Sequence, residues 1–136
     1  MIIQTCSLFR QLPEWEAHKT TFEDYKLHNI QPDFYGRDAE LSYPHVHHIH
    51  LAQDKDQHVS ARWSNIKQVY YRTHDKTKPE EDYWLIYAHD DFSNNCLLLT
   101  VIGDHAHDRQ KWRSYLTSLY TTFVQPWING QLPCAM

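Results

Sequence analysis

At 136 residues and 16.4 kDa, the chain is long enough for one domain with its own core, and its 41% hydrophobic content is typical of globular proteins. The net charge of −4 argues against the broad basic surface of a general nucleic-acid-binding protein, and no Walker or dinucleotide-binding motif occurs. Three cysteines without a CxxC spacing predict neither a disulfide framework nor a cysteine zinc site, so we expect a reducing, cytoplasmic location.

The first third of the chain predicts a strand, a helix and a loop. Ile2–Phe9 is typical of a short strand, and Pro13 opens a segment whose apolar positions favour a helix to about His28. The segment PDFYGRDAE, residues 32–40, has no clear period. We expect it to be a loop with Gly36 as its permissive joint.

Four strand-like segments follow, separated by polar runs: HVHHIHL (45–51), QVYYRT (68–73), DYWLIYA (82–88) and NCLLLTVIG (95–103). Residues 108–124 then carry apolar side chains at helical spacing, which predicts a terminal helix that covers the sheet. The pattern indicates an α+β fold, an antiparallel meander packed with an N-terminal and a C-terminal helix. We assign residues 1–124 to a single domain and residues 125–136 to a short tail. No stretch approaches the roughly 20 apolar residues of a membrane span.

Four of the eleven histidines fall between His45 and His50. In a strand, His47, Ile49 and Leu51 would share one face, and His48 and His50 would project together from the other. Three interpretations stay open: a metal site, an acid–base site, or half-exposed histidines without a role. The metal interpretation needs a third ligand, usually a carboxylate, and no local spacing ties in another histidine from His89, His105 and His107.

The acid–base interpretation fits RNA cleavage without a metal. A base takes the proton of the ribose 2′-OH, cations stabilise the transition state, and an acid protonates the departing 5′ oxygen. Histidine suits both proton transfers because its unperturbed pKa is near 6.5.

Several motifs occur together in order: YGRDA (35–39), HHIHLA (47–52), YYRTHD (70–75), WLIYA (84–88), and LLLTVI followed by HAH (105–107). Together they resemble the YafO family of type II toxin–antitoxin toxins. The three strand-like motifs from residue 70 onward are more distantly similar to the meander of RelE and ParE toxins. The resemblance implies a RelE-like fold and the activity of a ribosome-dependent mRNA interferase that uses no cofactor or metal. It also implies a cognate antitoxin that silences the toxin and can form an oligomer with it.

The resemblance also implies site residues. His50 and His107 are the expected proton-transfer pair, and Arg72 is the expected phosphate clamp because its planar fork suits phosphate oxygens. The wider set of expected catalytic side chains adds His48, Tyr87 and His105, and the expected RNA-binding residues are Arg37, Thr73, His74, Arg109 and Lys111.

Alternatives accompany these assignments. Tyr87 on a central strand also fits a packed aromatic with a bonded hydroxyl, and Arg37 and Asp38 also fit an ion pair that pins the loop. A shift of two residues would exchange His105 for His107. Two rival functions remain, a non-catalytic binding module of RelE or ParE type that acts on a protein target, and a histidine-metal protein.

Overall fold

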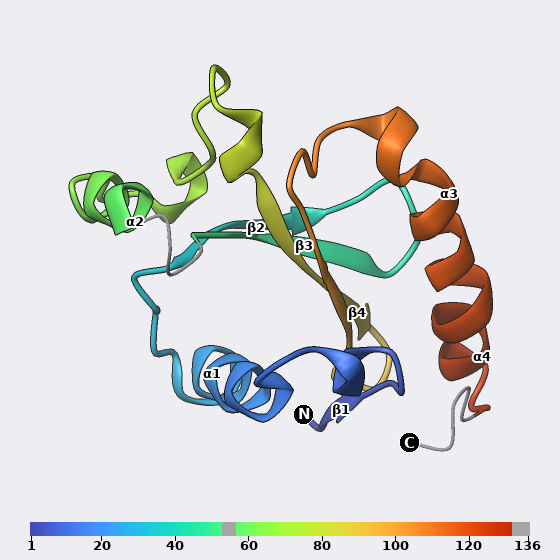
Figure 1. The fold of residues 1–136 in the computed structure, drawn as a ribbon. Helices are drawn as coiled ribbons and strands as arrows, with labels where there is room; N and C mark the ends of the chain where they lie inside the picture. Colours follow the sequence, from blue (N-terminus) through green and yellow to red (C-terminus); the bar gives the residue numbers. More distant parts are fainter. Residues whose placement is uncertain (53–56, 132–136) are drawn as a thin grey trace.

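A five-stranded mixed sheet forms the centre of the molecule (Figure 1), in a computed structural model that describes residues 1–52 and 57–131. The strand order is β1-β5-β4-β3-β2. β1 is parallel to β5, and every other neighbouring pair is antiparallel. The α+β class and the antiparallel meander are therefore confirmed, with one parallel strand added at its edge. The strands are β1 (Ile3–Thr5), β2 (Tyr35–Glu40), β3 (Val46–Leu51), β4 (Tyr83–Asp90) and β5 (Asn95–Ile102).

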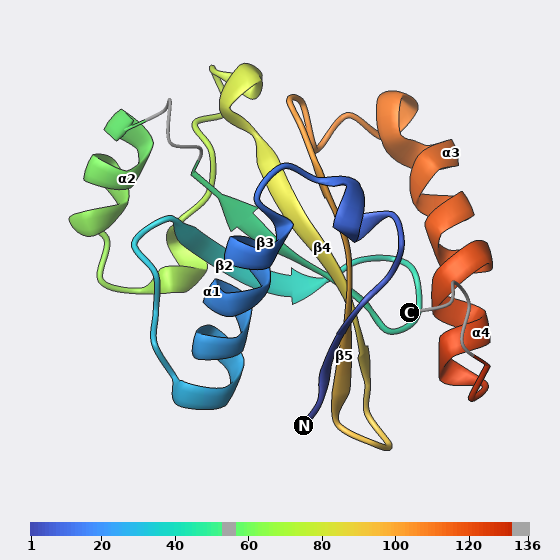
Figure 2. The same ribbon diagram turned by 60° about the horizontal axis from the view of Figure 1, so that its bottom comes forward.

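β4 and β5 are the buried centre of the sheet, and for β5 the nearly continuous apolar run LLLTVI predicts this position. Leu85, Ile86, Leu97, Leu98 and Leu99 are fully buried. Helices lie on both faces of the sheet (Figure 2), which agrees with the burial of these side chains.

Helices from the two ends of the chain cover opposite faces of the sheet (Figures 1 and 2). α1 (Trp15–His28) packs the buried Phe22 against Tyr87, with ring centroids 5.0 Å apart. α3 (Arg109–Leu119) covers the other face, where the hydroxyl oxygens of Tyr115 and Thr100 are 3.3 Å apart. The N-cap of α3 is Asp108, whose carboxylate accepts bonds from the backbone N–H groups of Gln110 and Lys111.

The predicted tail begins too early. A π-helical turn (Tyr120–Val124) and α4 (Gln125–Ile128) continue α3, and Trp127 is buried with its Nε1 donating to Gln4 Oε1 at 2.8 Å. Residues 125–128 therefore belong to the packed fold, and residues 132–136 lie outside the described part. The first strand is also shorter than predicted, because it ends at Thr5 and a 3₁₀ turn follows at Phe9–Gln11.

The predicted loop at residues 32–40 is mostly strand β2, so that prediction was wrong. β2 is an edge strand that pairs with β3. Gly36 is not a flexible joint, because a Cβ there would lie 2.1 Å from the backbone oxygen of Arg72. The glycine instead allows another segment to approach closely, and Arg37 N–H donates to that Arg72 oxygen at 2.9 Å.

The predicted strand QVYYRT was also wrong. Val69–Tyr71 is a 3₁₀ turn, and its Tyr70 and Tyr71 are 59% and 60% exposed. Aromatic residues are common in strands, which explains the wrong prediction, but these two point into solvent and pair with no strand of the described chain. The preceding helix α2 (Gln57–Ser64), which packs Trp63 into a small second core, was not predicted. Within the described residues, no helix is long and apolar enough to cross a membrane.

Candidate functional site

Two histidines of β3 are buried on the face that α3 covers. His48 and His50 are 8% and 2% exposed, and their ring centroids are 5.2 Å apart. Trp84 on β4 packs against both, with its ring 4.2 Å from His48 and 5.7 Å from His50. The expected alternation of β3 is therefore confirmed, but the interpretation of these two histidines as half-exposed strand residues is wrong.

Loop residues bring two more histidines to this pair. The ring of His107, from the turn before α3, lies 5.4 Å from His50, and the ring of His74 lies 4.7 Å from His107. We call His48, His50, His74 and His107 the histidine cluster. Distant segments thus converge on one point at the end of the sheet.

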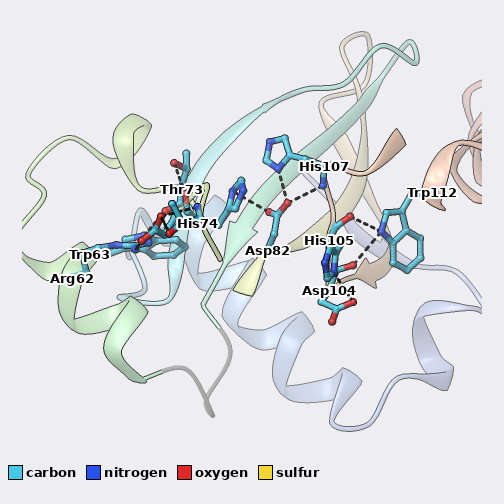
Figure 3. A network of polar contacts seen from close by, with 11 residues as sticks. Arg62, Trp63, Thr73, His74, Asp82, Asp104, His105, His107 and Trp112 are labelled. Carbon is cyan, nitrogen blue, oxygen red and sulfur yellow. Dashed lines mark hydrogen bonds and ion pairs between the residues drawn. The ribbon is translucent and has the colours of Figure 1, made fainter. Parts of the chain in front are cut away.

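Asp82 lies between His74 and His107 (Figure 3). Its Oδ2 accepts hydrogen bonds from the backbone N–H of His107 at 2.8 Å and from His107 Nδ1 at 2.6 Å. Its Oδ1 lies 3.4 Å from His74 Nδ1, yet neither of these two buried atoms has a hydrogen-bond partner among the described residues. The carboxylate is 1% exposed, whereas the His107 side chain is 51% exposed. A buried acid thus orients an accessible imidazole.

Burial controls the charges in the cluster. Loss of water lowers the pKa of His50 to about 3 and that of His48 to about 4, and the nearby histidine charges lower the pKa of His50 further. Burial also lowers the pKa of His74, against the opposing effect of Asp82. Burial disfavours the Asp82 carboxylate too, but hydrogen bonds from His107 outweigh it and lower the Asp82 pKa. The cluster therefore holds a buried anion among mostly neutral imidazoles.

A pocket of about 550 Å³ adjoins His107. Trp84 and His107 form its wall on the cluster side, and α3 and the β2–β3 loop complete it. The other described residues of the lining are Leu41, Ser42, Tyr43, Ala106, Asp108, Arg109, Gln110, Trp112, Arg113 and Leu116. The pocket thus gives a ligand access to the exposed imidazole of the cluster.

Three residues of the site have the donor atoms that a metal ion would need. His50, His74 and Asp82 each offer one ligand atom, all within 4.8 Å of one another. The carboxylate that the sequence pattern lacked is therefore present, although its Oδ2 is occupied by His107. The geometry admits both proton transfer and metal binding at these residues.

Tyr87, expected to be catalytic, lies on the opposite face of the sheet from the histidine cluster. Its hydroxyl donates to Asp38 Oδ1 at 2.7 Å, and its ring packs on Phe22 of α1. Asp38 also accepts from Tyr25 at 2.8 Å and pairs with Lys26 at 3.3 Å. Tyr87 is therefore the packed aromatic with a bonded hydroxyl of the alternative interpretation, and Asp38 pairs with α1 and not with Arg37.

The expected phosphate clamp is engaged elsewhere. Arg72 Nε donates to the carbonyl of Ile66 at 3.0 Å, which ties together the segment after α2. Arg37 Nε donates to the carbonyl of Tyr70 at 2.6 Å, and its guanidinium lies 4.0 Å from the Tyr70 ring centroid. Neither guanidinium has a hydrogen bond, ion pair or ring contact with the cluster among the described residues, but the charge of Arg37 lies near enough to help lower the pKa of His48. The Thr73 carbonyl accepts hydrogen bonds from Arg62 and Trp63, and these bonds fix the loop segment that carries His74.

His105 and His107 differ in their surroundings, although they are two residues apart. His105 Nδ1 lies 3.1 Å from Asp104, and the His105 carbonyl accepts a bond from Trp112 (Figure 3). Lys111 also pairs with Asp104, at 2.8 Å. Within the described part of the chain, His107 contacts the cluster and His105 does not.

Two central residues of the site were not predicted. Asp82 and Trp84 were assigned only to the predicted strand DYWLIYA, with no role in a site. The acidic residues 80–82 directly before an apolar strand are a weak indication of a site. A carboxylate that becomes buried where such a strand begins needs a hydrogen-bonding partner. The partners come from residues 74 and 107, which no local pattern connects to it.

Most of the chain matches a known protein family. The family model of toxin YafO, of type II toxin–antitoxin systems, matches residues 23–129 of the 136-residue chain, which includes the whole histidine cluster and α3. Comparison with curated proteins and with solved structures found no match, so the expected RelE likeness of the fold stays a prediction. The chain belongs to the YafO toxin family of type II toxin–antitoxin systems, and its partner is accordingly an antitoxin protein.

Proposed function

We propose that this toxin is a ribosome-dependent mRNA interferase that cleaves translated mRNA without a metal. The 2′ oxygen attacks the adjacent phosphorus, the bond from phosphorus to the 5′ oxygen breaks, and the products carry a 2′,3′-cyclic phosphate and a 5′-OH. One proton leaves the 2′-OH and one is added to the 5′ oxygen. The observation that carries the proposal is the pair of buried Asp82 and half-exposed His107 at the edge of a pocket.

His107 is the first proton-transfer residue. Its Nδ1 is held by Asp82, so Nε2 is the atom that faces a reacting group, and it has no partner among the described residues. A carboxylate on one nitrogen fixes the tautomer and stabilises the imidazolium that forms when the other nitrogen takes a proton. This arrangement supports a histidine that accepts and returns a proton during the reaction.

His74 is the second proton-transfer residue in this proposal. Its side chain is 13% exposed and its ring is 4.7 Å from that of His107, whereas His50 is only 2% exposed. A substrate reaches His107 and His74 more readily than His50. His50 and His48 therefore position the pair from below, as a neutral surface on which the His107 ring packs.

Cations for the phosphorus transition state come from beside the cluster and not from Arg72. Arg109 and Arg113 line the pocket next to His107, and Arg62 contributes positive charge near His74. Guanidinium groups stabilise phosphate oxygens by paired hydrogen bonds. Local cations on a chain of net charge −4 suit docking on a ribosome, which we propose takes place in the cytoplasm with the antitoxin released from its complex.

The test uses purified ribosomes that translate a defined mRNA. We expect discrete cuts within the translated region, with 5′-OH ends, that disappear when a translation inhibitor is present. A chelator selective for transition metals over Mg²⁺ should leave the cuts unchanged. Cleavage that stops with this chelator and returns with added Zn²⁺ would replace proton transfer by a metal mechanism at the same residues.

The rival function is a non-catalytic toxin that acts by binding a protein target. In that case the mRNA would stay intact on translating ribosomes while growth still stops. The same reaction, read by primer extension, therefore separates the two functions in one experiment.

A further inference from the structure

We propose that the pocket beside His107 is a nucleotide subsite, which binds one nucleotide of single-stranded mRNA next to the scissile phosphate. The inference rests on the proposed function and adds to it the place where the substrate is held. Its volume of about 550 Å³ falls within the range of small-molecule sites and is enough for one nucleotide.

Aromatic rings form much of the pocket wall. Trp84, Trp112 and Tyr43 line it together with His107. Unstacked bases of single-stranded RNA bind to such rings by stacking, and the contact tolerates any base because each has a π-face. The wall is therefore of the kind that holds a nucleobase.

The aromatic walls are fixed before a ligand arrives. The Tyr43 hydroxyl donates to the Arg113 carbonyl at 3.3 Å and lies 3.0 Å from Thr117 Oγ1, which joins the β2–β3 loop to α3. Trp112 Nε1 donates to the carbonyls of Asp104 and His105 at 3.3 and 3.0 Å. A prearranged wall reduces the entropy lost when a ligand binds.

Two cations of the pocket are available to an anion. Arg109 and Arg113 are exposed on consecutive turns of α3, and neither guanidinium has an ion pair or hydrogen bond among the described residues. The one carboxylate of the lining, Asp108, already accepts two backbone bonds as the N-cap of α3. Free guanidiniums beside aromatic walls suit a ligand that has both a phosphate and a base.

An unpartnered donor is a second, independent indication of a ligand. Trp84 is 6% exposed, and its indole N–H has no hydrogen-bond partner in the described structure. Leaving a buried donor unpaired lowers stability, so such a donor needs another reason to persist. An oxygen or ring nitrogen of a base is the kind of acceptor that this donor lacks.

The first experiment is NMR of the indole N–H groups in the full chain, which has five tryptophans. The probes are 2′-O-methyl trinucleotides of A, C, G and U, because they lack the 2′-OH and stay uncut. We expect saturable shifts of the Trp84 and Trp112 signals with at least one probe, and no comparable shift of Trp63 or Trp127, which do not line the pocket. Equal shifts of all signals, or none, would overturn the proposal.

Variants of the exposed arginines then test the charge. Arg109→Ala combined with Arg113→Ala should weaken binding of the preferred trinucleotide about tenfold or more. Both positions are exposed on a helix, where alanine is the best helix former, so the fold should persist. Lys19→Ala, on the helix that covers the opposite face, is the matched control and should bind as the wild type does. Unchanged affinity in the double variant would contradict the subsite.

The two proposals fail separately. If ribosomal cleavage occurs but no trinucleotide perturbs the pocket, the nucleotide subsite is wrong and the function stands. If the pocket binds a trinucleotide but no message is cut, the function is wrong and the site is an RNA-binding site. If only the antitoxin shifts Trp84 and Trp112, the pocket is the antitoxin contact and the subsite is refuted.

Discussion

Asp38 in β2 and Asp82 directly before β4 are two carboxylates that differ in how completely their oxygens are hydrogen-bonded. Asp38, on the α1 side, has both oxygens bonded: Oδ1 to Tyr87, and Oδ2 to Tyr25 and Lys26. Asp82, directly before the first residue of β4, is bonded at Oδ2 to His107 only, and its Oδ1 has no hydrogen-bond partner within the described chain.

The difference separates a structural network from a functional one. A fully bonded network stabilises one conformation, whereas buried polar atoms without partners cost stability and need another reason to persist. On the α1 side one neighbour of Asp38, the Tyr35 hydroxyl, has no partner among the described residues, whereas around Asp82 three buried atoms have none: Asp82 Oδ1, His74 Nδ1 and Trp84 Nε1. The same face also carries the half-exposed His107 and the pocket. The unsatisfied network is therefore the one that we expect to contact a substrate.

The largest expected effect comes from His107. His107→Ala should lower the rate of mRNA cleavage by about 10²–10⁴-fold, because it removes a proton-transfer group. His105→Ala is the matched control, since His105 is half-exposed in the same turn but lies outside the cluster. It should keep nearly the wild-type rate. Single-turnover cleavage on ribosomes measures both, and an equal loss in the two variants would contradict the assignment of His107.

The second prediction compares the two carboxylates directly. Asp82→Asn keeps the shape of the side chain but removes the charge that stabilises an imidazolium, so cleavage should fall about a hundredfold or more. Asp38→Asn should leave the rate per folded molecule unchanged and lower the free energy of unfolding by about 1–3 kcal/mol, because it weakens the bonds to Lys26 and two tyrosines. Rates and urea denaturation are measured on both variants. A loss of rate in Asp38→Asn without loss of stability would undo the contrast.

The sequence predicted the parts of the fold that local patterns control. The apolar runs of β4 and β5 and the helical spacing of α3 identified these elements because burial on two faces, or on one stripe, leaves a clear period. β2 was missed because YGRDAE alternates no apolar residues, and its strand geometry comes from pairing with β3. Gly36 was read as a joint although it is required for contact with Arg72.

The site was predicted in part for the same reason. His48 and His50 were found because they lie two residues apart on one strand, and the resemblance to YafO toxins added His107. Asp82 joins the site only through long-range contacts with His74 and His107, which alternation and spacing do not encode. Tyr87 was misplaced because a conspicuous tyrosine on a central strand does not show which face carries the chemistry.

The smallest expected effect is the dependence of stability on pH, which tests the burial of the strand histidines. Burial lowers the folded-state pKa of His50 to about 3 and of His48 to about 4, whereas both should be near 6.5 in the unfolded chain. The unfolded state therefore binds more protons between these values. The contribution of the two histidines to the free energy of unfolding is therefore fully present above about pH 6.5. It decreases as the pH falls below that value, by up to about 1.4 kcal/mol per pH unit for each histidine.

Replacement of one histidine sharpens this last comparison. His50→Leu removes one titrating group from the buried face, so the loss of stability between pH 6.5 and 4 should become shallower by about 1.4 kcal/mol per unit at most. His28→Gln, at the exposed end of α1, is the control and should leave the slope unchanged. Urea denaturation at pH 7, 6, 5 and 4 measures the slope. Asp82 changes stability in the same direction at more acidic pH. Because its pKa is lowered in the folded protein, its contribution to the free energy of unfolding is lost as the pH falls through the folded-state pKa of its carboxylate. An unaltered slope in His50→Leu would mean that folding does not lower the pKa of His50, so the surface beneath His107 would gain charge as the pH falls through the ordinary histidine range and would not stay neutral.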